Sequence, residues 1–241
     1  GNGVQHSGDN YWTACFNMNG CDFTLGGYDA GTGVVNNWKR TRVEVTNGVL
    51  RVADPSFGTT RQSHAYVVHA GGTLIYPYSE TSVMMAPSGL TETWTIKNGG
   101  RGEIYNAIAI HNENPGLCTY LVETGGTLIF APYSMQVNEY YNEYGLTFEN
   151  HGTFRAPHGF IWMGDSNSSS VRDTNALTLR QSAGIMLLGG DFKKTGKCRT
   201  APGVMTFELV GGTLEITNSV AFFTPESAYV PAKGWYEQVY G

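Results

Sequence analysis

Short runs of alternating apolar and polar residues flank a glycine-containing pair that recurs along the chain. The pair and its flanks are almost identical in three places, VHAGGTLIY at 68–76, VETGGTLIF at 122–130 and LVGGTLEI at 209–216. Looser copies are VTNGVLRV at 45–52, IKNGGRGEI at 96–104, ENHGTFRA at 149–156 and RQSAGIMLL at 180–188. Seven copies at intervals of 24 to 32 residues predict a repeat architecture, in which each copy is one structural unit.

The alternation within each copy predicts two strands joined by a corner. We align the copies on the first residue of the pair, which is Asn47, Gly71, Gly99, Gly125, His151, Ala183 or Gly211. The positions three and five residues later are apolar in nearly every copy, and the position between them is mixed. The position four residues earlier is apolar in five copies. In the copies at Gly99 and His151 the apolar residues are shifted by one position, so the inward residues are expected to be Trp94, Ile96, Leu146 and Phe148. Such alternation is typical of strands with one face in the core.

Units of about 27 residues with two inward strands each can bury their apolar positions by stacking on one another. We therefore predict an all-β fold, a right-handed parallel β-helix (β-solenoid) of about seven coils formed by residues 39–224. The Gly pair would lie at a corner where the backbone turns sharply and successive coils approach closely. Residues 1–38 match the pattern poorly, so we expect a cap or an irregular first coil there. Residues 225–241 are expected to be a C-terminal cap or a truncated continuation.

Composition excludes several classes of protein. Charged residues are only 15% of the 241 residues, while Gly (32) and Tyr (14) are abundant, so the chain is neither disordered nor a helical bundle. The net charge is −5, and basic residues cluster only at 38–42 and 192–199, which argues against nucleic acid as a partner. No apolar run is long enough to cross a membrane, so we expect no membrane insertion. The chain begins at Gly1, and we expect it to be a mature form or a part of a longer chain.

The cysteines indicate an exported protein. They are Cys15, Cys21, Cys118 and Cys198, an even number without metal-ligand spacing. We predict two disulfides, Cys15–Cys21 closing a small loop and Cys118–Cys198 formed through the fold. Three pairings remain open at this point, and buried free thiols are the alternative.

The GGTL-type corners with alternating flanks, over roughly residues 40–224, resemble the β-helix repeats of bacterial secreted and surface proteins, including autotransporter-like passenger domains. The resemblance implies secretion or a place at the cell surface, and a role in display, adhesion or glycan binding. The expected partner is a polysaccharide or a cell-surface glycan. Similar repeats also occur in polysaccharide lyases and hydrolases, so a polysaccharide-active enzyme is the alternative, with a lyase acting on acidic glycans ahead of a hydrolase.

A lyase removes the proton next to a uronate carboxyl group with a basic residue, His or Tyr, and neutralises that carboxyl group with a cation. The candidates are His151, Arg155 and His158 in NHGTFRAPHGF, with Tyr141 in the preceding NEYYNEYG. The strand alternation predicts that Arg155 points outward. We expect no cofactor for a binding domain, whereas in a lyase the cation is supplied by Arg, Lys or Ca²⁺. The competing interpretation assigns these residues ordinary roles at the surface or in turns.

Aromatic side chains are the candidates for glycan binding, because sugars stack on their faces. They are Tyr78, Tyr133, Tyr140, Tyr144 and Trp162. Tyr78 and Tyr133 occupy equivalent places in YPYS and APYS, so they are expected to form a ladder. In the competing interpretation this ladder only covers the turn.

Overall fold

The computed structural model is built entirely from strands and the corners that join them, within the residues that it describes. These residues are 4–5, 12–17, 19–25, 40–52, 63–76, 83–85, 91–105, 108–110, 116–131, 137–139, 144–163, 176–190, 192–195, 204–217 and 236–240. Nothing in this part of the chain forms a helix of the length and apolarity needed to cross a membrane.

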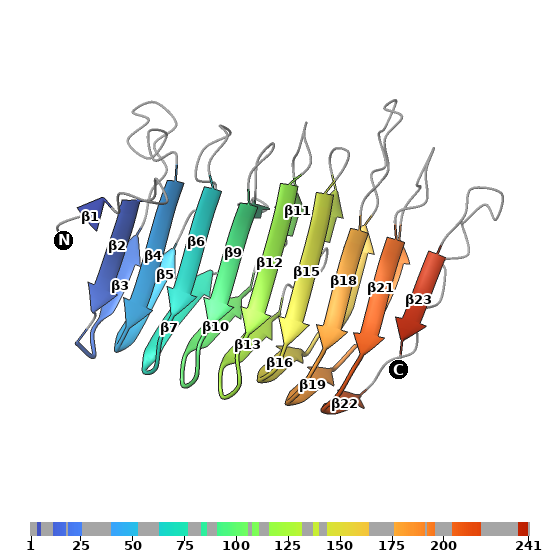
Figure 1. Ribbon diagram of the computed structural model, residues 1–241. Helices are drawn as coiled ribbons and strands as arrows, with labels where there is room; N and C mark the ends of the chain where they lie inside the picture. The colour runs from blue at the N-terminus through green and yellow to red at the C-terminus, as the bar shows by residue number, and fades with distance from the viewer. Residues whose placement is uncertain are drawn as a thin grey trace.

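Sheet A is the longest of three parallel sheets (Figure 1). Its parallel strands are β2 (Trp12–Asn17), β4 (Arg40–Thr46), β6 (Ser63–Val68), β9 (Thr91–Ile96), β12 (Gly116–Val122), β15 (Tyr144–Asn150), β18 (Ala176–Gln181), β21 (Val204–Leu209) and β23 (Tyr236–Tyr240). A short strand, β1 (Val4–Gln5), pairs antiparallel with β2. It therefore occupies the edge of sheet A at the N-terminal end, where further parallel strands could otherwise add.

Sheets B and C complete the coils. Sheet B consists of β3 (Asp22–Leu25), β5 (Gly48–Val52), β7 (Gly72–Tyr76), β10 (Arg101–Ile104), β13 (Thr127–Phe130), β16 (Thr153–Ala156), β19 (Ile185–Leu188) and β22 (Thr213–Ile216). Sheet C consists of β8 (Val83–Met85), β11 (Ile108–Ile110), β14 (Val137–Glu139), β17 (Phe160–Met163) and β20 (Phe192–Thr195). Each strand pairs with the equivalent strand one coil away, which is the pairing of a solenoid.

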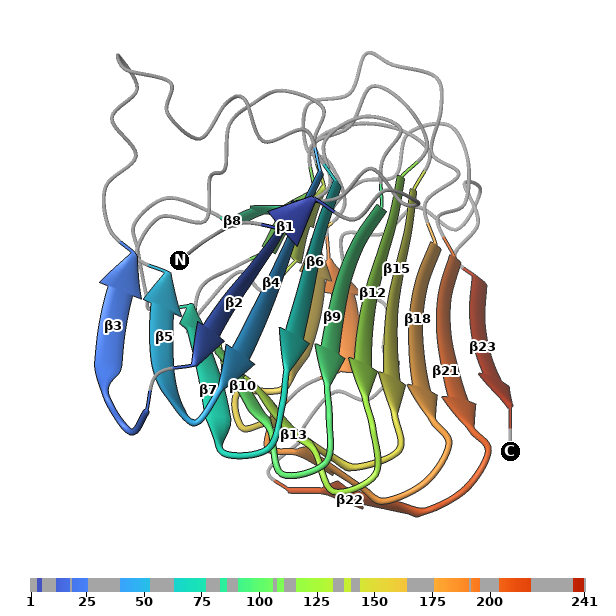
Figure 2. The ribbon, with the colours of Figure 1, turned by 60° about the vertical axis from the view of Figure 1, so that its left-hand side comes forward.

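The predicted right-handed parallel β-helix is confirmed. In Figure 1 the chain descends along the strands of sheet A in front, turns a corner and ascends along sheet B behind, while it advances from left to right. Figure 2 shows the corners joining the lower ends of the sheet A strands to sheet B. We number the coils by their strands in sheets A and B, from coil 1 (β2 and β3) to coil 8 (β21 and β22). Parallel pairing extends on both sides of the predicted 39–224, because coil 1 and β23 also pair in register.

The inward rows of sheets A and B form one continuous core. Each inward residue lies above its equivalent in the next coil, and the buried side chains are Val43, Val45, Leu50, Tyr66, Val68, Leu74, Tyr76, Trp94, Ile96, Ile104, Tyr120, Val122, Leu128, Phe130, Phe148, Phe154, Ala156, Leu179, Met186, Leu188 and Phe207. Aromatic rings stack along the middle of this core, with centroids 4.7 Å apart for Tyr76 and Trp94 and 4.5 Å apart for Tyr120 and Phe148. Such offset contacts add to the stability given by burial itself.

One predicted column is wrong in two coils. The position four residues before the glycine pair selected Val67 and Leu121 as inward residues. The register instead stacks Tyr66 and Tyr120 on Trp94, and it places Val67 and Leu121 in the outward row. The corner differs in length between coils. A fixed count of four residues back across it therefore reaches an inward residue in some coils and an outward residue in others.

The corner lengths can be read from the two inward residues that flank each corner. In coils 3, 4 and 5 the second inward residue is the sixth after the first, as from Val122 to Leu128, and we call this a six-residue corner. It is the fourth after the first in coil 6, from Asn150 to Phe154, and the fifth in coil 7, from Gln181 to Met186. The corners therefore absorb length differences that the strands do not tolerate, because a one-residue slip would invert the faces of a strand.

The two glycines of a six-residue corner have different roles. Gly125 has a φ of 79°, a conformation that side chains with a Cβ rarely adopt. Gly126 has an ordinary φ, but a Cβ there would lie 2.5 Å from the carbonyl oxygen of Ile96 in the coil below. The first glycine thus permits the turn, and the second permits the close approach of successive coils.

We expect Gly126→Ala to destabilise the protein by about 1–3 kcal/mol, since the backbone oxygen that its Cβ meets cannot move without breaking the coil-to-coil pairing. The midpoint of denaturant unfolding measures this loss. The control is Thr124→Ala, at an exposed position of the same corner, and it should change stability by less than about 0.5 kcal/mol. Equal effects of the two substitutions would contradict the close-approach argument.

Candidate functional site

The outer face of sheet A carries a row of identical hydroxyl side chains. The register stacks Thr93, Thr119, Thr147, Thr178 and Thr206 on one another in coils 4 to 8. We call these five residues the threonine row. Neighbouring members are separated by the strand spacing of about 4.8 Å. Most of them are half-buried, so the sheet presents an even, uncharged line of methyl and hydroxyl groups along the solenoid axis.

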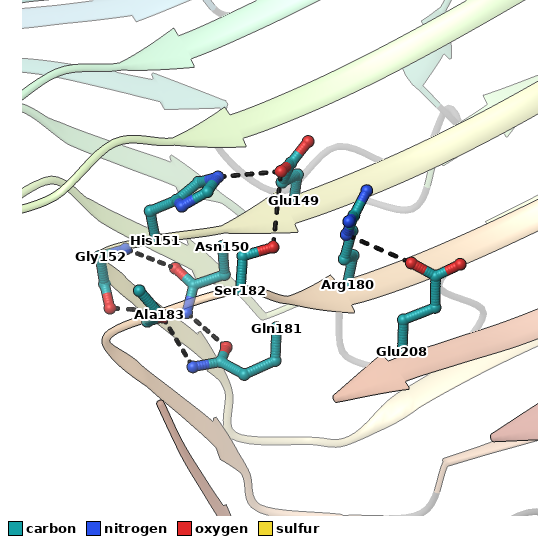
Figure 3. Close-up of polar contacts among 9 residues, drawn as sticks. All are labelled: Glu149, Asn150, His151, Gly152, Arg180, Gln181, Ser182, Ala183 and Glu208. Carbon is teal, nitrogen blue, oxygen red and sulfur yellow. Dashed lines mark hydrogen bonds and ion pairs between the residues drawn. The ribbon is translucent and has the colours of Figure 1, made fainter. Parts of the chain in front are cut away.

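Beside the threonine row, charges alternate in sign near the corners of coils 6 to 8. Glu149, Arg180 and Glu208 are register neighbours in β15, β18 and β21. The Nε atom of Arg180 lies 3.2 Å from Oε2 of Glu208, which is an ion-pair distance without hydrogen-bond geometry. Figure 3 shows this pair and, beside it, the contacts of Glu149. The charges are partly exposed, so their net contribution to stability is small.

Glu149 brings together the three side-chain types of a hydrolase triad, but in an order that does not activate a nucleophile. Its Oε1 atom lies 2.9 Å from Nε2 of His151 and accepts a hydrogen bond of 3.5 Å from the hydroxyl of Ser182 (Figure 3). In a working triad the imidazole stands between the hydroxyl and the carboxylate, where it can take the hydroxyl proton. Here the carboxylate stands in the middle, so His151 has no contact through which to deprotonate Ser182.

Below these charges, two buried amides interrupt the apolar inward row. Asn150 is 1% exposed and Gln181 is 0% exposed, and they continue the row of Val122. The Nδ2 group of Asn150 donates hydrogen bonds to Oε1 of Gln181 at 2.7 Å and to the carbonyl of Ile185 at 3.0 Å. The backbone N–H of Gly152 donates to Oδ1 of Asn150 at 3.1 Å. We call this pair of side chains the amide bridge.

The amide bridge explains how coil 6 turns with so short a corner. Neither His151 nor Gly152 has a positive φ, in contrast to the glycine corners of the preceding coils. The Asn150 side chain satisfies the backbone N–H of Gly152, and Nε2 of Gln181 donates to the carbonyl of Ala183 at 2.8 Å. Buried polar groups are costly unless they are paired, and here they pair with the corner backbone. The amide bridge is therefore a structural element of the corners.

Of the predicted lyase residues, the structure describes His151, Arg155 and His158. Arg155 is exposed between the buried Phe154 and Ala156, so its predicted outward position is confirmed. It lies on the outer face of sheet B, however, whereas the ring of His151 contacts Glu149 of sheet A. His158 is exposed in the turn after β16, beyond the end of that strand. His151 and Arg155 are therefore directed to the outer faces of different sheets.

The other predicted site residues are described in part or not at all. Tyr144 begins β15, and Trp162 lies in β17 of sheet C, where the register pairs it with Val137. Only the backbone of these two residues is described. The remaining aromatic candidates, Tyr78, Tyr133, Tyr140 and Tyr141, lie outside the described residues, so their roles stay predictions.

Of the cysteines, Cys21 is an exposed free thiol in the corner of coil 1. The predicted Cys15–Cys21 disulfide is therefore not formed. Cys15 belongs to β2 of sheet A and Cys21 precedes β3 of sheet B, so the turn of the corner lies between them. Cys198 lies outside the described residues, and the predicted pairing of Cys118 stays a prediction.

A second polar cluster lies on the outer face of sheet B in coil 4. Glu103 is 9% exposed and accepts hydrogen bonds from Nε of Arg101 and, at 2.8 Å, from the hydroxyl of Tyr105. Burial raises the pKa of Tyr105 above its usual value near 10, and the hydrogen bond to Glu103 raises this pKa further. Both causes favour the protonated phenol. Within the described part of the chain, this cluster contributes one carboxylate, whereas glycoside hydrolysis ordinarily uses a pair.

Sequence reasoning missed the amide bridge, Glu149 and the Arg101–Glu103–Tyr105 cluster. A signal for the amide bridge was present, because Asn150 and Gln181 follow the last aromatic or aliphatic inward residue of their strands. The alignment on the glycine pair concealed this signal, because the shorter corners place Asn150 and Gln181 closer to the pair than Val122 is. Among the described residues, no three His, Cys, Asp or Glu side chains are grouped so as to hold a metal ion.

Comparisons with known proteins do not assign this chain to a group. No protein-family model, curated protein sequence or solved structure matches it.

We expect Asn150→Val to destabilise the protein by about 1–3 kcal/mol. Valine fits the row formed by Val122, but it leaves the buried N–H of Gly152 and the carbonyl of Ile185 without this partner. Denaturant unfolding measures the change, and Thr147→Val, on the outer face of the same strand, is the control with an expected change below about 0.5 kcal/mol. If Asn150→Val is as stable as the control, the amide bridge does not support the corner.

We expect Tyr105→Phe to change the dependence of stability on pH above 10. The pKa of Tyr105 is higher in the folded than in the unfolded state, so its contribution is complete below pH 10 and decreases as the pH rises towards the folded pKa. The stability difference between wild type and Tyr105→Phe, about 1 kcal/mol at pH 8, should therefore shrink as the pH rises above 10. Unfolding midpoints at a series of pH values measure it. A difference that stays constant with pH would contradict the raised pKa.

Proposed function

We propose that this chain is an exported bacterial β-helix domain for display at the cell surface, and that it binds an uncharged glycan along the threonine row. The observation that carries the proposal is the uninterrupted run of five stacked threonines on an outer sheet face. A comparable row on the outer face of sheet B contains Thr73, Thr127, Thr153 and Thr213, but Arg101 and Ile185 interrupt it. A linear ligand can lie along such a row and meet equivalent hydroxyl groups in successive coils.

The charge distribution favours a neutral glycan over an acidic one. The chain has a net charge of −5, and Glu149, Arg180 and Glu208 flank the threonine row in coils 6 to 8 with one more negative than positive charge. This balance disfavours a polyanion. Hydroxyl groups on the protein can donate and accept hydrogen bonds with the hydroxyl groups of a sugar.

The alternative, an acidic-glycan lyase, has less support. It requires a base and a cation that face the same substrate proton and carboxyl group. His151 and Arg155 belong to different outer faces, and the Glu149–Ser182–His151 contacts have an order that activates no nucleophile. A panel of acidic polysaccharides incubated with the protein should therefore yield no unsaturated or reducing ends. If such ends appear and Arg155→Ala removes them, the enzyme interpretation replaces the proposal.

Binding to a glycan array tests the proposal directly. We expect neutral polysaccharides to bind, and we expect Thr147→Val with Thr178→Val to weaken binding at least about tenfold, because two hydroxyl groups are lost while the β-branched shape remains. The matched control is Thr127→Val with Thr153→Val, which removes two stacked hydroxyl groups from the outer face of sheet B.

The control double variant should bind like the wild type. A blank array, or equal weakening by both double variants, would overturn the proposed binding along the threonine row. Thermal unfolding of each variant shows whether a loss of binding comes from a loss of fold.

A further inference from the structure

The outer face of sheet B has a row with a periodic charge pattern. The register aligns Arg51, Ile75, Glu103, Ile129, Arg155, Leu187 and Glu215 in seven successive coils. Charged and aliphatic residues alternate, and the sign of the charge changes at each charged position. When the order of the row is reversed, each position that held a charged residue holds one of the opposite charge. Each position that held an aliphatic residue again holds an aliphatic residue.

The exposed part of this row lies in coils 6 to 8. Arg155 and Glu215 are exposed, and Leu187 between them is half-buried. In the parallel row of the same face, Ile185 is 43% exposed and stands between Thr153 and Thr213. Together with Leu187 in the neighbouring row, Ile185 gives this part of the face an accessible apolar surface between the charged residues.

We propose that this patch, Arg155, Leu187, Glu215 and Ile185, is an interface with a second copy of the chain. A two-fold axis parallel to β19, lying between the two faces, reverses the order of the coils and keeps the rows aligned. Arg155 then faces Glu215 of the second copy, and the same pair forms again by symmetry. Leu187 meets its own equivalent near the axis, as does Ile185.

Symmetry is the reason to choose a second copy over another partner. A two-fold interface must be complementary to itself, which requires each charge to face the opposite charge after reversal. The patch meets this condition with an arginine, a leucine and a glutamate in successive coils. Without reversal, as when two solenoids lie parallel, Arg155 would face Arg155. The solenoids in the dimer are therefore antiparallel.

The position of the axis follows from exposure. An axis at Ile129 would also pair opposite charges, with Arg155 facing Glu103 of the second copy. Glu103, however, is already bonded to Arg101 and Tyr105 and is only 9% exposed. The axis at β19 uses side chains that are accessible. Three strands form a small interface, so we expect a weak, concentration-dependent dimer.

Cysteine cross-linking tests the axis, because it captures a weak dimer. In a Cys21→Ser background, Leu187→Cys places two thiols next to each other at the axis, and mild oxidation should give a covalent dimer. The matched control is Ile129→Cys, which is in the same row two coils away. It should cross-link at least about tenfold less. A greater yield from Ile129→Cys, or no cross-linked dimer from Leu187→Cys above the background protein, overturns the proposed interface.

Charge reversal tests the pairing independently. Arg155→Glu places two glutamates opposite each other, and Glu215→Arg places two arginines opposite each other, so either change should lower the Leu187→Cys yield at least about tenfold. The double variant Arg155→Glu with Glu215→Arg restores opposite charges and should restore the yield. A mixture of the two single variants should cross-link as a heterodimer, since both pairs are then opposite.

Sedimentation velocity at increasing concentration, on the chain with its native cysteines, should show the same order of association among the charge variants. Failure of the double variant to recover, with its thermal unfolding unchanged, would contradict the Arg155–Glu215 pairing. If association instead survives every charge reversal, another surface forms the dimer and the proposal is wrong.

Discussion

The stacking of every backbone position on its equivalent in the next coil is the constraint on which the rest of this structure depends. Parallel strands stand about 4.8 Å apart, so a corner can be no thicker than a bare backbone. Gly126 lies against the carbonyl of Ile96 for this reason, and a Cβ on Gly100 would lie 2.4 Å from the carbonyl oxygen of Val68 in the preceding coil. The strands can keep an exact register only because the backbones of successive corners can approach each other this closely.

Because the register is exact, equivalent residues of successive coils form continuous rows. The effect of each residue then depends on its neighbours in the row. An inward row of Val45, Val68, Ile96 and Val122 buries apolar surface without gaps, because each side chain packs on its neighbours above and below. The same geometry makes a polar residue in that row a problem for both adjacent coils. Asn150 and Gln181 solve it together, since each amide has its partner directly in the next coil or in the corner backbone. A single amide there would leave more buried hydrogen-bonding groups unpaired.

The periodic features of the sequence predicted the fold, and the features that interrupt the period were missed. The positions after the glycine pair identified the inward Leu74, Leu128 and Phe130, because no length variation lies between the pair and the strand. The positions before it misplaced Val67 and Leu121, because the corner intervenes and its length is set by backbone contacts that have no simple sequence pattern. Arg155 was correctly placed on the outer face by alternation alone. That His151 turns to Glu149 and away from Arg155 depends on the bend of a four-residue corner, which no propensity describes.

Stacking of the coils by itself favours the same residue type at equivalent positions. Residues that break this repetition therefore indicate interactions outside the coils. The threonine row repeats one small residue, and cross-strand packing of β-branched side chains is sufficient to stabilise it. The row from Arg51 to Glu215 is different, because neither core packing nor strand pairing requires alternating charges two coils apart. Between Arg155 and Glu215, the aliphatic Leu187 occupies the intervening coil. The order of these three residues is complementary to its own reversal, and a two-fold-related copy of the same face would pair Arg155 with Glu215. The pattern therefore indicates a requirement on the assembled state, which folding of a single chain does not impose.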